Sequence, residues 1–540
     1  MDKSMEKHQT KIGKNLIEIL MYSMYDDAKV VLREYVQNAY DAINEAVEHG
    51  ILESTKYGHV NIILDSKHRS VRINDNGTGI VKKLAAKKLL DIADSFKDGK
   101  NTAGHYGIGR LTGLQFCERL IFKTSAKGEN EYTQVVFDSN LAREILNDSS
   151  DHRNAEEVVN SISSVSSGKE SADAHYFEIE MENIRADYSQ LLDEESVREY
   201  LEEVAPIDYS TTFKNLLIKT SEIPPHLKVQ RDNLKSIQLS INNLVDIRKR
   251  YGVKIEGTGD PIKTLHYFDV IDDEYGFLAW GWFAITAFTK AIPVKDRNRG
   301  IRLRKKNIQV GTANLLDKYF EESRGNNYFY GEVFAVHDNL RPNSDRTALV
   351  ATPEAGRFYE LIKVKFHDLH KLYHLANDLK TSLKDVVYGE RLASTQDKEE
   401  LEVAKTKLEE GLGKMMKAEK KGLTSVPASQ FLIDIYKESA SKSVEEFERK
   451  TSSKPSVELP IVPKKKVPAQ EMINKEALMT TSTQAVQVVD IFAPLKETYG
   501  ADDVKLIRKI FASFTKHCPL ANRALLEELK KKAIKELSNG

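Results

Sequence analysis

A carboxylate, a carboxamide and a second carboxylate recur at helical spacing near the N-terminus. Glu34, Asn38, Asp41 and Glu45 follow one another at intervals of four, three and four residues, so in a helix they lie on one stripe. Such a stripe is usually the solvated side of a surface helix. The same residue types could instead hold a water beside a metal-bound phosphate, with Glu34 as general base and Asn38 giving an oxygen to Mg²⁺.

A second group ends an alternating strand and reads INDNGTG from Ile73 to Gly79. Asp-Asn-Gly is common in hairpin turns, so a tight turn is one interpretation. The two glycines, Gly77 and Gly79, would also let the backbone pass close to a flat ligand. Asp75 could then accept a hydrogen bond from an exocyclic amine.

A third group, GHYGIGR, places glycines at 104, 107 and 109 directly before a helix-like segment. Glycines at a helix N-terminus can present amide hydrogens and the positive end of the helix dipole to phosphates. This group is weak evidence by itself. All three groups in this order between residues 34 and 109 are much less probable by chance than any one of them.

The elements that would position these groups follow from the hydrophobic pattern. Apolar residues recur at helical spacing from Leu16 to about Val47. Strand-like alternation follows in runs from Val60 and from Ser70, which a polar turn joins as in a hairpin. Further helical patterning covers 81–92, and more strand-like runs begin at 118, 132 and 175. The stretch 140–173, rich in Ser, Asn, Asp and Glu, predicts a helix plus a flexible insertion.

Beyond a charged helix that ends at Pro206, the pattern changes three times. A second strand-rich region runs to about Glu354, and a helical, charged segment from Phe358 to about Lys421 suggests a hairpin arm or short coiled coil. Residues 452–468 have linker composition, and 486–537 predict a last helical block.

Composition excludes several broad classes of protein. The 540 residues carry a formal net charge of −1, so the overall electrostatic field of the protein does not favour binding to nucleic acid or to an anionic membrane. The two cysteines, Cys117 and Cys518, are too few for a disulfide framework or a structural zinc site and indicate a reducing cytosol. We expect neither secretion nor membrane insertion, because the N-terminus is polar and no apolar run approaches the roughly 18 residues of a membrane span.

The segments LREYVQNAYDAI, INDNGTGI and GHYGIGRLTG resemble the three ATP-binding motifs of the GHKL superfamily, which comprises gyrase, heat-shock protein 90, histidine kinases and MutL. The first segment is most similar to heat-shock protein 90. A later segment, GEVFAVHDNLRPNSDRTAL, resembles the part of that family's middle domain whose arginine reaches the ATP γ-phosphate, and Arg346 matches that arginine. The resemblance covers about residues 10–355.

This resemblance implies a Bergerat-type α/β sandwich that binds ATP, an α+β middle domain and a helical C-terminal region. It implies Glu34 and Arg346 as catalytic residues, with Glu34 orienting the water, and Asn38 as a ligand of Mg²⁺. The nucleotide-binding residues that it implies are Asn38, Asp41, Asp75, Gly77, Gly79, Gly104, Gly107, Ile108 and Gly109.

The chain departs from the family at three places. Ala174 and His175 stand where a Gly-Thr pair usually supports the adenine-binding aspartate, which puts the adenine side of the site in question. His105 stands where glutamine is common. Arg346 follows Asp345, so a local salt bridge is an alternative role, and Arg341 is a less favoured substitute.

The predicted domains are an ATP-binding domain (1–205), a middle domain (206–372), a helical or coiled-coil-like segment (373–450), a linker (451–485) and a helical, possibly dimerising, domain (486–540). We expect slow, Mg²⁺-dependent ATP hydrolysis that closes a lid (81–109) and drives an N-terminal clamp. Such a protein would be a cytoplasmic homodimer acting on a protein client or a partner subunit.

Two other functions stay open. One is a DNA-associated GHKL ATPase of the MORC, MutL or gyrase kind, for which Lys305 and Lys306 offer a second-domain lysine, so nucleic acid is not excluded as a partner. The other is a nucleotide-regulated scaffold with negligible hydrolysis, for example in a multicomponent defence system. The presence of Glu34 argues against the scaffold.

Overall fold

The computed structural model describes residues 12–22, 27–91, 109–219, 223–243, 247–394, 397–425 and 428–452. The chain divides into two compact units, 1–454 and 455–540, and all of the described residues belong to the first. The predicted helical block at 486–540 and all but the first two residues of the predicted linker lie outside the described residues.

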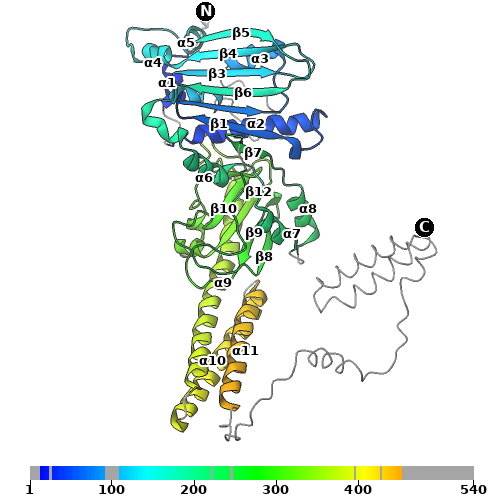
Figure 1. Cartoon of the computed structure of the whole chain (residues 1–540), viewed down its shortest axis with the longest axis vertical. Coiled ribbons are helices and arrows are strands. Elements are labelled where there is room, and N and C mark those ends of the chain that lie inside the picture. Colours follow the sequence, from blue (N-terminus) through cyan, green and yellow to red (C-terminus); the bar gives the residue numbers. More distant parts are fainter. Residues whose placement is uncertain are drawn as a thin grey trace, which may run out of the picture. The chain divides into compact units, whose positions relative to one another are not determined.

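The first unit opens with a seven-stranded sheet of order β5-β4-β3-β6-β2-β1-β7 (Figure 1). All neighbouring pairs are antiparallel except β1 with β7, which are parallel. The strands are β1 His59–Asp65, β2 Ser70–Asp75, β3 Arg119–Ser125, β4 Glu131–Asp138, β5 Ser163–Lys169, β6 Tyr176–Glu182 and β7 Gln238–Ile241.

One face of this sheet is packed against helices, and the other carries charge. Alternate residues of β2, namely Val71, Ile73 and Asp75, are buried, as expected for a sheet with one covered face. The covering elements are α1 Asn15–Tyr22, α2 Val30–Glu48, α3 Lys82–Leu90, α4 Ser139–Asn147, α5 Ala155–Ile162, α6 Glu194–Val204 and the short 3₁₀ helices η1 Thr55–Tyr57, η2 Gly109–Gln115 and η3 Ala186–Leu192. The predicted α/β sandwich is confirmed.

Two local predictions need correction. The predicted helix from Leu16 to Val47 is two helices, α1 and α2. The stretch 140–173, predicted as a helix plus a flexible insertion, has its helix in α4, but it also contains α5 and the edge strand β5, which pairs with β4 along seven residues. Asn154 caps α5 with a full capping box, and such a cap lets a polar sequence start a helix.

A second, five-stranded sheet has the order β11-β10-β12-β9-β8. Its strands are β8 Thr264–Asp272, β9 Gly276–Ile285, β10 Gly300–Lys305, β11 Ile308–Val310 and β12 Tyr330–Ala335, with β10 and β12 parallel. Helices cover both faces. Phe283 and Ile285 of β9 face the core shared with α9 (Pro353–Leu392), η4 (Asp317–Tyr319) and η5 (Ser323–Tyr328). Trp280 and Trp282 face α7 (Thr211–Lys219) and α8 (Pro225–Asp232).

The chain crosses from the first sheet to the second and back. After β6 and α6 it forms α7 and α8, which pack on the second sheet, and then returns as β7 beside β1. Parallel neighbours require such a crossover connection. The boundary predicted between residues 205 and 206 therefore lies inside the crossing stretch, and the first sheet takes a strand from beyond it.

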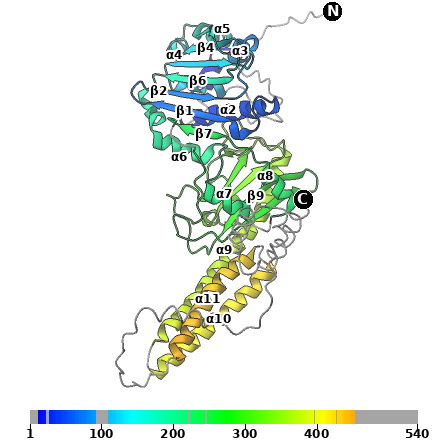
Figure 2. The same cartoon turned by 45° about the vertical axis from the view of Figure 1, so that its right-hand side comes forward.

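Three helices follow the second sheet and pack together lengthwise (Figure 2). They are α9, α10 (Lys398–Ser425) and α11 (Ser429–Ser452). Leu379 and Val386 of α9 share a core with Leu408 of α10 and Tyr436 of α11. α9 begins at Pro353 behind the N-cap Thr352, so the boundary predicted at 372/373 falls within one helix. Among the described residues, no helix has the length and apolar character needed to span a membrane.

Candidate functional site

Two of the four polar residues on the α2 stripe are buried, whereas Glu45, at its C-terminal end, is exposed. Glu34 and Asp41 are only 7% and 6% exposed, and Asn38 is half-buried. Gly109, at the start of η2, lies against the Glu34 side chain, where an added Cβ would come within 2.9 Å of Glu34 Oε2. Carboxylates without a function in binding or pairing are rarely buried. Glu34 and Asp41 are therefore not on a solvated face of α2.

Arg33 links Glu34 to the second domain. Its Nη2 lies 3.0 Å from Glu34 Oε1 and also donates to the carbonyl oxygen of Asp345 at 3.1 Å. Both side chains of this ion pair are at most 10% exposed. The loop from 341 to 350 is thus brought to α2 beside Glu34. Sequence reasoning did not single out Arg33, whose only signal is its position next to Glu34.

The same loop carries Arg346 in a buried, left-handed conformation. Arg346 is 4% exposed and has a φ of 57°, which is uncommon for a residue other than glycine. Its carbonyl oxygen accepts a 2.6 Å hydrogen bond from the Gly311 amide. Asp345 Oδ1 accepts from the amide and hydroxyl of Thr347. Arg341, the less favoured candidate, is exposed.

The Asp-x-Gly-x-Gly loop packs between α2 and the ends of β3 and β6. Gly77 donates its amide to Asp75 Oδ1 at 2.8 Å. A Cβ on Gly77 would lie 2.6 Å from the Ala42 Cβ, and one on Gly79 would lie 1.8 Å from the Ser125 carbonyl oxygen. Gly79 also has a φ of +62°. Both positions therefore require glycine.

Asp75 is a buried carboxyl group at the end of β2. It is 4% exposed, and burial raises its pKa to about 7, an effect that the Gly77 amide only partly offsets. A buried carboxyl whose pKa is shifted by desolvation is typical of a binding or catalytic site. Asp75 could therefore accept a hydrogen bond from a bound ligand.

His175 and Thr124 support this loop. The His175 Nδ1 is 2.9 Å from the Gly77 carbonyl oxygen, to which it can donate. Thr124 Oγ1 accepts from the Ile80 amide and donates to the Tyr176 carbonyl, both at 2.9 Å. His175 thus holds the loop at Gly77, at the position where the resembled family places threonine.

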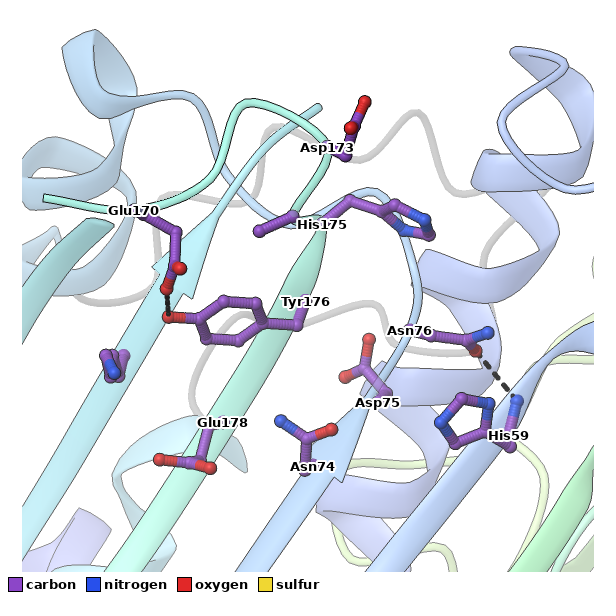
Figure 3. A pocket seen from close by; sticks show the side chains of 11 residues that line it. His59, Asn74, Asp75, Asn76, Glu170, Asp173, His175, Tyr176 and Glu178 are labelled. Carbon is purple, nitrogen blue, oxygen red and sulfur yellow. Dashed lines mark hydrogen bonds between the residues drawn. The ribbon is translucent and has the colours of Figure 1, made fainter. Parts of the chain in front are cut away.

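A pocket of about 560 Å³ opens beside His175 at the ends of β2 and β6 (Figure 3). Figure 3 shows Asp75, Asn76 and His175 around the end of β2, with Asn76 bonded to the His59 amide. The pocket is lined by His59, Asn74, Asp75, Asn76, Lys123, Glu170, Asp173, Ala174, His175, Tyr176 and Glu178.

The glycine motif is only partly visible. Gly104, Gly107 and Ile108, together with His105, lie outside the described residues, and Gly109 is its one predicted phosphate contact inside them. The segment that comes next is fixed to α2, because Tyr35 Oη donates to the Arg110 carbonyl and accepts from the Gly113 amide, each at 3.0 Å.

Lys305, the alternative second-domain lysine, is engaged within its own domain. Its Nζ donates to the carbonyl oxygens of Val336 and His337 at 3.1 and 2.7 Å. Burial lowers its pKa to about 8. These contacts give Lys305 a structural role at the end of β10.

Comparison with known proteins agrees with this geometry. Residues 25–168 match the family described as histidine kinase-, DNA gyrase B- and HSP90-like ATPases. This part of the chain is a GHKL-type ATPase domain. The match contains α2 with Glu34 and Asn38, and the loop from Asp75 to Gly79.

Among GHKL proteins, the domain is most like heat-shock protein 90. It is 29% identical over 140 residues to the chaperone protein HtpG of Idiomarina loihiensis, which is 22% of each chain. Identity to HtpG of Bacillus licheniformis is 28% over 138 residues, covering 23% of this chain and 22% of the relative. For HtpG of Geobacter sulfurreducens it is 24% over 157 residues, covering 26% and 24%. The chain thus spans under a quarter of the length of the curated relatives it matches.

Proposed function

We propose that the protein hydrolyses ATP in a Mg²⁺-dependent reaction that needs both domains. Glu34 acts as the general base, and Arg346 neutralises charge on the γ-phosphate. The observation that carries this proposal is the bridge from Glu34 through Arg33 to the Asp345 carbonyl. Through it the loop of Arg346 is docked at the residue that would orient the water.

The residues of the first domain fit a nucleotide. Asp75 would accept a hydrogen bond from the exocyclic amine of adenine. Gly77 and Gly79 have no side chain, so their backbone could lie close to the base. Asn38 fits a Mg²⁺ ligand, because it carries an amide oxygen and lies half-buried one turn after buried Glu34. When bound, Mg²⁺ neutralises phosphate charge. Asp41 and Gly109 complete the polar lining of this site.

The proposed reaction is the in-line attack of water on the γ-phosphorus. As the new P–O bond forms, the bond to the ADP oxygen breaks, and the water proton passes to the Glu34 carboxylate before it leaves to solvent. Arg33 holds that carboxylate in place through its ion pair. Because phosphoryl transfer depends on positioning and charge neutralisation, the docking of the second domain would control the rate.

The conformational output is also part of the proposal. Closure of the lid (81–109) over ATP and an N-terminal clamp within a cytoplasmic homodimer would give a chaperone or a related conformational machine acting on protein clients. The likeness of the ATPase domain to proteins named chaperone protein HtpG supports this.

The deciding experiment measures steady-state ATP hydrolysis and nucleotide binding for Glu34→Ala and Arg346→Ala. We expect Glu34→Ala to bind ATP and lose turnover by about 100-fold or more, and Arg346→Ala to lose turnover by a similar factor with affinity kept. Arg341→Ala, on the exposed part of the same loop, is the matched control and should hydrolyse normally. If wild type binds ATP but both substitutions leave its rate unchanged, the assignment is wrong and the scaffold hypothesis replaces it.

A second measurement addresses the chaperone proposal. The intact protein should suppress heat-induced aggregation of a model substrate such as citrate synthase in an ATP-dependent manner, and Glu34→Ala should change that dependence. Suppression that is the same with and without ATP would separate ATP hydrolysis from client handling.

A further inference from the structure

Gln309 lies at the junction between the two domains with both polar atoms of its amide engaged. It is 2% exposed and belongs to β11. Its Nε2 donates to Glu203 Oε1 at 3.2 Å and to the Gly311 carbonyl at 3.1 Å, and its Oε1 accepts from Arg302 Nη1 at 3.0 Å. A side-chain amide with three of its four hydrogen bonds formed fixes the groups around it.

The partner of Gln309 in the first domain is the last turn of α6. Glu203 pairs there with Arg302 at 2.7 Å, and its carbonyl oxygen accepts from Arg304 Nη2 at 2.9 Å. Both arginine side chains are at most 3% exposed. Buried charges are retained only when they are paired, and pairing of this kind specifies a geometry.

From Gln309 the hydrogen bonds continue to the proposed catalytic loop. Gln309 holds the Gly311 carbonyl, and the Gly311 amide donates to the Arg346 carbonyl at 2.6 Å. Gly311 has a φ of +67°, and an added Cβ would lie 2.8 Å from the Thr347 carbonyl oxygen. The turn therefore packs directly against the loop of Arg346.

We propose that Gln309, anchored on Glu203, is a positioning residue that sets the place of Arg346 in the ATPase site. The loop is then held from two sides by the first domain, by Arg33 at Asp345 and by Glu203 through Gln309 and Gly311 at Arg346. This inference rests on the proposed function, since it takes Arg346 as the residue at the γ-phosphate. The left-handed backbone of Arg346 would then be held by contacts from outside its own loop.

The test is Gln309→Met in the full chain, because methionine has a similar shape and cannot form the three hydrogen bonds. We expect kcat to fall about tenfold, because small misplacements of a catalytic group are costly, while KM for ATP and the Kd for ADP change less than about twofold. Tyr436→Phe is the matched control. It also removes one partly buried hydrogen bond, from α11 to the Ala287 carbonyl, and should leave kcat unchanged.

A double-mutant cycle separates positioning from general damage. Combined with Arg346→Ala, Gln309→Met should cause no further loss of kcat, because its effect passes through Arg346. An undiminished tenfold loss in the Arg346→Ala background would overturn the proposal, as would a rise in KM at constant kcat. If Gln309→Met does not fold, Glu203→Gln takes its place, with an expected loss of about threefold and the same dependence on Arg346.

Failure of the positioning role of Gln309 can be distinguished from failure of the proposed function. A normal rate for Gln309→Met beside a slow Arg346→Ala contradicts only the positioning role. A normal rate for Arg346→Ala contradicts the proposed function and this inference with it.

Discussion

Asp75 of the first sheet and Glu332 of the second are both buried carboxylates, but their surroundings differ. Asp75 ends β2 in the first sheet, and Glu332 lies in the middle of β12 in the second; both are at most 4% exposed. Glu332 is paired by Arg304 Nε at 2.5 Å and Lys249 Nζ at 3.1 Å. The hydrogen bond that Asp75 accepts comes from the Gly77 amide.

The pKa values of the two groups move in opposite directions. Burial raises the pKa of Asp75 to about 7. Burial would also raise that of Glu332, but Arg304 and Lys249 together hold the pKa of Glu332 below its ordinary value. A carboxylate satisfied by its own domain is part of the scaffold, whereas Asp75, which accepts from one amide among the residues that the structure describes, suits a ligand.

The largest expected effect comes from removing Glu332, the carboxylate whose charge is paired within its own domain. Glu332→Ala leaves the Arg304 and Lys249 side chains, each 1% exposed, without their counter-charge. We expect the free energy of unfolding of the second domain to fall by about 3–5 kcal/mol, measured by chemical denaturation. Asp75→Asn should instead leave stability unchanged or raise it at pH 8.

Two results would test this contrast further. A triple variant in which Glu332, Arg304 and Lys249 all become apolar residues of similar size should recover most of the lost stability, because no charge is left unpaired. If Glu332→Ala is no less stable than Asp75→Asn, the distinction between the two carboxylates does not hold.

The next effect concerns pH. Since the folded-state pKa of Asp75 is raised to about 7, its carboxylate acceptor is lost as pH falls through 7, and ADP affinity should drop about tenfold from pH 8 to pH 6. Asp75 also favours the folded state at low pH and loses that contribution as pH rises through 7. Asp75→Asn should therefore gain stability relative to wild type above pH 7.

Calorimetric titration of both proteins across this range checks the prediction. Comparing wild type with Asp75→Asn at each pH removes the ionisation of the phosphates and of other side chains. A wild-type pH dependence that is also present in Asp75→Asn would exclude Asp75 as its source.

A smaller effect is expected at His175, which supports the loop that follows Asp75. His175→Ala removes the hydrogen bond to the Gly77 carbonyl and should weaken ADP binding about fivefold, the worth of one such bond. His175→Asn, which can still donate, is the control and should recover part of the affinity. Equal binding by all three proteins would mean that the loop holds its shape without His175.

The smallest effect belongs to the open face of the first sheet. Arg72 and Glu180 pair there across β2 and β6 at 2.7 Å, with Arg72 43% exposed. Because exposed pairs contribute little, Arg72→Ala should cost less than about 1 kcal/mol, and less again in 0.5 M salt. A cost near that of Glu332→Ala would show that burial does not decide the strength of these Arg–Glu pairs.

The motifs and most strands of the first domain could be predicted because their signals are local. Asp75, Gly77 and Gly79 end an alternating run, and the structure places them against α2 as one loop. β7, at four residues, was missed because its sequence is too short to carry a periodic signal and its pairing with β1 comes from far along the chain.

The second domain was harder to predict for a physical reason. Arg302 and Arg304 alternate with apolar residues in β10, a pattern that predicts one solvated face, yet every residue of β10 is buried. The cover comes from α6 and the crossing stretch, which pair with those arginines. The path from Glu203 through Gln309 to Arg346 depends on the same long-range contacts.

The return of the chain as β7 imposes an order on biosynthesis. The ATPase sheet stays incomplete until residue 241 has left the ribosome, with β1 as an unpaired edge strand until then. By that point α7 and α8 have emerged, while β8 and β9, which cover Phe213 and Leu227, have not yet left the ribosome. Nascent chains therefore pass through a stage with both an open strand edge and a bare apolar helix surface, which is when aggregation competes with folding.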